Sequence, residues 1–89
     1  MSMWTIEISK GAVKDAQKVK RSPFADKVKT LLALLAKNPF HVPPPYEKLT
    51  SPPADTYSRR INQQHRLVYQ VHKEEGVVKV LRMWTHYGD

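Results

Sequence analysis

The 89-residue chain contains no cysteine, which excludes both a disulfide framework and thiolate chemistry. Its three glycines, Gly11, Gly76 and Gly88, are too scattered to form a phosphate-binding glycine loop. No apolar run approaches the roughly 20 residues that a membrane-spanning helix needs. The first residues also lack a signal-peptide pattern, so a cytoplasmic location is the default expectation.

Metal and serine chemistry have no support in the sequence either. The four histidines do not fall in ligand spacing and paired carboxylates are missing, so we predict no metal and no cofactor. No serine lies in a recognisable nucleophile elbow. Positive charge, by contrast, is abundant: 15 Lys and Arg against 8 Asp and Glu give a net charge of +7. This excess favours an anionic partner, either nucleic acid or an acidic protein.

The first half of the chain predicts one strand and two helices. Residues 4–8 alternate between apolar and polar side chains, which is typical of a strand with one buried face. Ser9 is a candidate N-cap for a helix over 10–20, and Ser22-Pro23 predicts the start of a second helix that ends at Lys37. The apolar stripe of the second helix is the strongest helical pattern in the chain: Phe24, Val28, Leu31, Leu32 and Leu35.

The second half predicts a proline-rich loop and three antiparallel strands. Five of the seven prolines lie within 41–55, which favours extended backbone without a central strand. Ser58 to Val71 predicts a hairpin, and 77–84 predicts a last strand after a turn at Gly76. We therefore expect residues 1–89 to form a single α+β domain. Its twisted, mostly antiparallel sheet should carry both helices on one face.

The hairpin, SRRINQQHRLVYQV, places arginines opposite a buried face. Successive strand residues point to opposite sides, so Leu67 and Tyr69 can face a core while Arg60 and Arg66 face away. Guanidinium groups match phosphate oxygens in a bidentate way. A phosphate-binding face and a merely solvated face are both compatible with this pattern.

Three residues outside the helices could cleave a phosphodiester without metal. Such cleavage needs a base, an acid and a cation for the charge that grows on phosphorus, and Glu47, His86 and Arg66 are candidates. RNA alone carries an internal nucleophile, its 2′-hydroxyl. An inert C-terminal histidine and a plain connecting loop around Glu47 are the alternative interpretations.

Three segments resemble the Txe/YoeB toxins of bacterial toxin–antitoxin modules, within the wider RelE-like group. They are PYEKL at 45–49, SRRINQQHRLVYQV at 58–71 and HY at 86–87. The order of predicted elements agrees as well, so the resemblance covers essentially the whole chain. Two features depart from the family, whose members commonly end in Arg-x-His-Tyr. Trp84 takes the place of that arginine, and the chain continues past Tyr87.

The resemblance implies a ribosome-dependent endoribonuclease that cleaves messenger RNA without metal. It implies that Glu47 is the general base, that Arg66 stabilises the phosphate and that His86 is the general acid. It also implies neutralisation by an acidic antitoxin of the YefM/Phd type, and a homodimer stays open. We further predict substrate contacts from six residues: Lys48, Arg59, Arg60, Arg82, Trp84 and Tyr87. A gyrase-directed toxin of the ParE type and a non-enzymatic basic module are the competing hypotheses.

Overall fold

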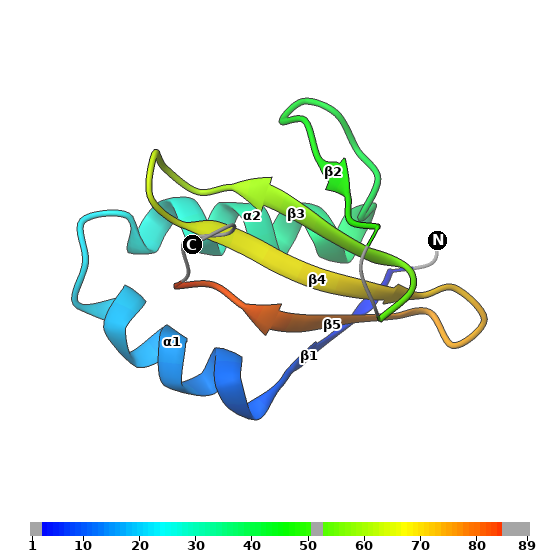
Figure 1. The fold of residues 1–89 in the computed structure, drawn as a ribbon, viewed down its shortest axis with the longest axis horizontal. Coiled ribbons are helices and arrows are strands. Elements are labelled where there is room, and N and C mark those ends of the chain that lie inside the picture. Colours follow the sequence, from blue (N-terminus) through cyan, green and yellow to red (C-terminus); the bar gives the residue numbers. More distant parts are fainter. Residues whose placement is uncertain (1–2, 51–52, 85–89) are drawn as a thin grey trace.

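The computed structural model describes residues 3–50 and 53–84 and forms two helices and five strands (Figure 1). The N-terminal half contributes the first strand and both helices, and the C-terminal half contributes the remaining strands. In chain order the elements are β1 (Thr5–Ile8), α1 (Lys10–Lys20), α2 (Ala25–Lys37), β2 (Glu47–Lys48), β3 (Thr56–Arg60), β4 (Arg66–His72) and β5 (Val77–Arg82).

The strands form one mixed sheet in the order β1-β5-β4-β3-β2. Only the β1–β5 pair is parallel, and the other three pairs are antiparallel. The predicted hairpin is β3 and β4, with Tyr57 opposite Tyr69 and Arg60 opposite Arg66. Gly76 has φ +68° in the turn before β5, as expected for its conformational freedom. The mostly antiparallel α+β architecture is confirmed.

Both helices cover the same face of this sheet (Figure 1). Val28, Leu31 and Leu35 of α2 are buried, which confirms the apolar stripe. They belong to one core cluster with the inward-facing strand residues Leu67 and Tyr69. Helix α1 adds Ala12 and Val19 to the same cluster. Among the residues described, neither helix packs across the opposite face of β3 and β4.

Helix α2 begins two residues later than the sequence predicts. Its N-cap is Phe24, and no side chain caps it. The Ser22 hydroxyl instead donates a 2.7 Å hydrogen bond to the carbonyl of Val19, so it serves the end of α1. Helix α2 ends at Lys37 as predicted, and Asn38 after it has extended backbone with φ −163°. The following Pro39 disfavours helical backbone at Asn38, which explains this conformation.

The proline-rich segment contributes an edge strand that the sequence pattern did not predict. Glu47 and Lys48 form β2, which pairs with Ser58 and Tyr57 of β3. The Leu49 amide extends this pairing by donating a 2.8 Å hydrogen bond to the Thr56 carbonyl. The pairing mounts Glu47 on the sheet rather than on a loop. Among the residues described, no helix is long and apolar enough to cross a membrane.

Candidate active site

Glu47 and Arg66 meet on the face of the sheet that the helices leave clear. Glu47 lies opposite Ser58 of β3, and Arg66 lies on β4 one strand further along. One Nη of Arg66 is 3.2 Å from a carboxylate oxygen of Glu47 and 3.5 Å from the Ser58 hydroxyl. The Glu47 side chain is 68% exposed and that of Arg66 28%. The base and the cation predicted from the sequence are thus in direct contact, within reach of solvent.

A hollow of about 590 Å³ surrounds this pair. It is lined by Lys27, Pro44, Pro45, Tyr46, Glu47, Ser58, Arg60 and Arg66. Among the described residues, three cations against one carboxylate line the hollow, and this excess of positive charge suits a polyanion. Arg60 lies here as predicted, whereas Lys48 does not line the hollow. Lys48 follows Glu47 in the same strand, so its side chain points to the other face.

The prediction that Arg59 contacts substrate is wrong, because this side chain is buried in the core. Only 1% of Arg59 is exposed. Its guanidinium donates hydrogen bonds to the carbonyls of Pro44 and Pro39 and to the Tyr69 hydroxyl. It also lies over the Tyr46 ring, 5.1 Å from the ring centre. Arg59 thereby ties the proline-rich segment to β3 and β4 just before Glu47.

Tyr69 completes this buried network. Its hydroxyl accepts the 3.1 Å bond from Arg59 Nε and donates a 3.0 Å bond to the Pro39 carbonyl. Burial raises the pKa of Tyr69 above 10, and the hydrogen bond from Arg59 only partly opposes that rise. The phenol therefore stays neutral at physiological pH. The sequence contained one sign of this burial. Arg59 lies two residues after the buried Tyr57, so its side chain points to the same face of the strand, whereas that of Arg60 points to the other.

Arg82 holds the end of β5 against α1 through a carboxylate that the sequence analysis did not single out. Asp15 is buried and accepts hydrogen bonds from Arg82 Nε at 2.8 Å and Nη2 at 3.3 Å. It also accepts from the backbone amides of Met83 at 3.0 Å and Trp84 at 3.2 Å. Burial alone would raise the pKa of Asp15, but these bonds together lower it below its usual 3.8.

We call the bonds of Asp15 to Arg82, Met83 and Trp84 the Asp15 clamp. The clamp occupies the Arg82 guanidinium, so Arg82 has a structural role in addition to any substrate contact. The sequence already indicated that Asp15 needs a buried partner. Asp15 lies on the same side of α1 as the core residues Ala12 and Val19, where a carboxylate needs a buried partner.

Trp84 follows the clamp and stacks on two rings. Its ring centre is 4.2 Å from that of His65 and 5.4 Å from that of Phe24. His65 is buried beside this ring and has a structural role. The predicted acid His86 and its neighbour Tyr87 lie outside the described residues. Trp84, whose amide is bonded to Asp15, lies two residues before His86 in the sequence.

The fold and the Glu47–Arg66 contact can now be compared with known proteins. A family described as the YoeB-like toxins of bacterial type II toxin–antitoxin systems matches residues 12–87. This chain belongs to that family. The match spans the candidate base, the arginines of the hairpin and the C-terminal His86. No curated protein matches the sequence significantly.

Solved structures agree with this family membership. A YoeB–YefM complex from Staphylococcus aureus contains a chain that is 31% identical, with a TM-score of 0.77 over 94% of this chain and 98% of that one. A YoeB/ParE toxin from Agrobacterium tumefaciens is 25% identical, with a TM-score of 0.83 over 93% and 99%. A DinJ–YafQ complex from E. coli shares the fold at 24% identity and a TM-score of 0.80, over 93% of each chain.

Proposed function

We propose that this YoeB-like toxin is an endoribonuclease that cleaves messenger RNA on the ribosome and thereby stops translation. The contact between Glu47 and Arg66 in an open, positively charged hollow is the observation that carries the proposal. A carboxylate base and a guanidinium within 3.2 Å of each other can both act on one phosphodiester. Membership in the YoeB-like family supports nuclease activity.

The reaction proceeds by transfer of the phosphoryl group to the neighbouring 2′-oxygen. The Glu47 carboxylate takes the proton of the 2′-hydroxyl, and the 2′-oxygen attacks phosphorus. Arg66 stabilises the negative charge that grows on the phosphate oxygens. The bond to the 5′-oxygen then breaks, and His86 protonates the leaving oxygen. The products are a 2′,3′-cyclic phosphate and a 5′-hydroxyl, and no step uses a metal.

Substrate binding changes the partner of Arg66. Without RNA, the guanidinium contacts Glu47 and the Ser58 hydroxyl. An incoming phosphate carries the same type of acceptor oxygens and competes for the guanidinium fork. When Arg66 turns to the phosphate, Glu47 is released to accept the 2′-proton. Arg60 and Lys27, which line the same hollow, hold the flanking phosphates.

The cellular partner that restrains this activity is an acidic antitoxin. The Staphylococcus aureus relative was solved as a YoeB–YefM complex, and another structure of that toxin is a dimer. We propose that an antitoxin of the YefM/Phd type neutralises this chain by covering its positive face in the cytoplasm. The net charge of +7 supports an acidic partner.

Primer extension on a translated message, with and without ribosomes, tests the proposal. We expect cleavage only in the presence of ribosomes, with new 5′-hydroxyl ends. Glu47→Gln and His86→Ala should each lower the cleavage rate by about 100-fold or more. Glu74→Gln, which changes an exposed carboxylate in the turn before β5, is the matched control and should cleave normally.

Two results would overturn the proposal. The first is full ribosome-bound cleavage by the His86→Ala protein. The second is an intact message together with inhibition of DNA supercoiling by gyrase, which would assign the chain to the ParE-type activity instead.

A further inference from the structure

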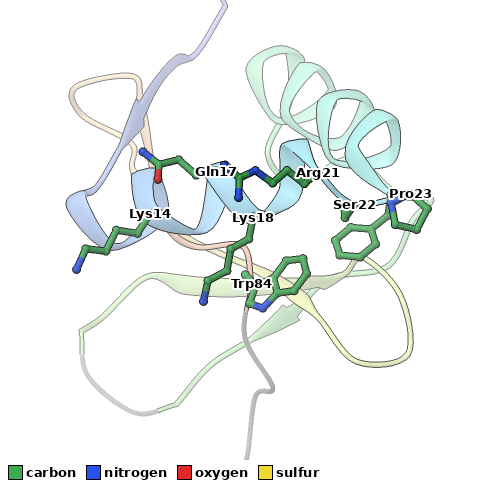
Figure 2. Close-up of a pocket in the computed structure, with 8 residues that line it drawn as sticks. Lys14, Gln17, Lys18, Arg21, Ser22, Pro23 and Trp84 are labelled. Carbon is green, nitrogen blue, oxygen red and sulfur yellow. The ribbon is translucent and has the colours of Figure 1, made fainter.

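A second hollow, of about 670 Å³, lies between α1 and Trp84, two residues after the end of β5 (Figure 2). It shares no lining residue with the hollow around Glu47 and Arg66. Its lining comes from the exposed side of α1, from the connection to α2 and from the end of the last strand: Lys14, Gln17, Lys18, Arg21, Ser22, Pro23, Phe24 and Trp84. We call it the α1 groove.

The floor of the α1 groove is aromatic and held in place. The Trp84 indole packs against two rings that also contact each other. Its plane lies 25° from that of Phe24 and 30° from that of His65, and the centres of those two rings are 5.5 Å apart. The Trp84 amide is fixed by Asp15, which also binds Arg82. Trp84 is only half-buried, so part of its surface borders the groove. A fixed and partly open indole is a stacking surface for a planar ligand.

The wall of the α1 groove is a row of cations on one helix face. Lys14, Lys18 and Arg21 recur at i, i+4 and i+7, and the uncharged Gln17 lies on the same helix face. All four are exposed, and Figure 2 shows Lys18 extending from α1 toward Trp84. The ion pairs found among residues 3–50 and 53–84 use none of these cations. Among the residues that the structure describes, no carboxylate lines the groove, so the charged side chains of its lining are all positive.

We infer that the α1 groove binds a single strand of RNA, with phosphates on Lys14, Lys18 and Arg21 and a base stacked on Trp84. Cationic walls that follow the backbone and aromatic side chains that stack bases are the two components of single-strand binding sites. An acidic peptide would satisfy the cations but leave the indole without a matching group, so RNA fits the groove better. This inference rests on the proposed function only in taking RNA as the substrate class.

Binding of a 2′-O-methylated RNA tests this inference without any cleavage, because this probe lacks the nucleophilic hydroxyl. A labelled strand of about ten nucleotides is titrated with the full chain, and fluorescence anisotropy gives Kd at about 50 to 200 mM salt. In the combined variant Lys14→Gln, Lys18→Gln, Arg21→Gln, Kd should rise by about tenfold or more. The slope of log Kd against log salt should fall by about 2 for three lost phosphate contacts.

The matched control removes the same charge from exposed lysines that do not line the α1 groove, by Lys20→Gln, Lys29→Gln and Lys37→Gln. Its Kd should change by less than about threefold if the groove, and not the net charge, binds the strand. For the base contact, Trp84→Leu should raise Kd by about fivefold or more, while Trp84→Phe should retain most of the affinity. Circular dichroism confirms that each variant is folded.

Three outcomes would overturn the inference. One is equal loss of affinity in the control variant, which would mean nonspecific electrostatics. Another is an unchanged Kd in folded Trp84→Leu protein. The third is a decaglutamate peptide that displaces the RNA and depends equally on Trp84, which would assign the α1 groove to an acidic protein segment. Since the probe cannot be cleaved, failure of the proposed catalysis would leave a positive binding result intact.

Discussion

At the scale of single residues, three arginines of one sheet region have three different roles. Arg66 faces the open hollow and contacts Glu47. Arg59 is buried and binds carbonyl oxygens of the proline-rich segment. Arg82 is paired with the buried Asp15. Guanidinium groups suit all three settings because five donors in a planar fork can satisfy carboxylates, carbonyls or phosphates.

The role proposed for Arg66 predicts that lysine cannot replace it. Lysine keeps the positive charge but loses the two parallel donors that match phosphate oxygens. Arg66→Lys should lower ribosome-bound cleavage by about 100-fold while leaving the midpoint of thermal unfolding nearly unchanged. Single-turnover cleavage together with a thermal melt checks both parts. Full activity of the lysine variant would contradict this prediction, because it would mean that Arg66 contributes only its positive charge.

The Asp15 clamp predicts a pH-dependent contribution to stability. The pKa of Asp15 is lower in the folded chain than its usual 3.8, so its bonds stabilise the fold fully above about pH 5. That contribution is lost as the pH falls through the lowered pKa. Asp15→Asn should therefore reduce the free energy of unfolding at pH 7 by about 2–4 kcal/mol, since the Met83 and Trp84 amides and Arg82 lose their anionic acceptor.

Urea unfolding at several pH values measures this contribution. The difference between the original chain and Asp15→Asn should shrink as the solution becomes more acidic. Asp26→Asn, an exposed carboxylate in the first turn of α2, serves as control and should change stability by about 0.5 kcal/mol or less. A difference that stays constant down to the lowest pH at which the chain folds would contradict the clamp.

At the scale of elements, the proline-rich segment and β3 form one unit that presents Glu47. The rings of Phe40, Tyr46 and Tyr57 pack edge-on or tilted, with centres 5.3 to 5.9 Å apart. Arg59 adds hydrogen bonds to two carbonyls of the same segment. The short strand β2 is therefore supported by the contacts of the proline-rich segment with the buried side chains of β3.

This arrangement predicts that Arg59 positions Glu47 without touching substrate. Arg59→Lys cannot reproduce three divergent hydrogen bonds, so the free energy of unfolding should fall by about 2–4 kcal/mol. The Leu49 amide, bonded to Thr56 beside Glu47, should exchange its hydrogen faster. Arg60→Lys, one residue along and exposed, should change stability by about 0.5 kcal/mol or less. Equal stability losses in the two variants would contradict this role.

At the scale of the whole molecule, one face of the fold is closed by helices and the other remains available to a large anion. The net charge of +7 favours both of the proposed partners, messenger RNA and an acidic antitoxin. The two proposed partners therefore compete for the same cations. Such competition would let the antitoxin inhibit cleavage by covering the positively charged hollow around Arg66.

Association with the cognate antitoxin should accordingly depend on salt. Raising the salt concentration from about 50 to 500 mM should slow association by about tenfold or more, because exposed charges are screened at that ionic strength. The dissociation rate should change less. Stopped-flow mixing of the separately purified proteins measures both rates. An association rate indifferent to ionic strength would contradict the electrostatic argument.

The sequence by itself determined both helices, the strands other than β2 and the pairing of the hairpin. The 3.6-residue period of Phe24 to Leu35 and the two-residue period of Leu67 to Val71 depend only on neighbouring residues, and both are confirmed. The same alternation placed Arg60 and Arg66 on the face away from the helices. Motifs around Glu47 and Arg66 also sufficed to indicate the family.

The tertiary structure alone decided which partners the buried charged groups Arg59 and Asp15 find. Arg59 binds carbonyls 15 and 20 residues away, and Asp15 binds groups 67 to 69 residues away. No local pattern shows whether a buried charge will find such partners, because burial is tolerated only where distant segments supply the hydrogen bonds. The α1 groove likewise exists only because the clamp brings Trp84 beneath Lys18, which lies 66 residues earlier in the chain.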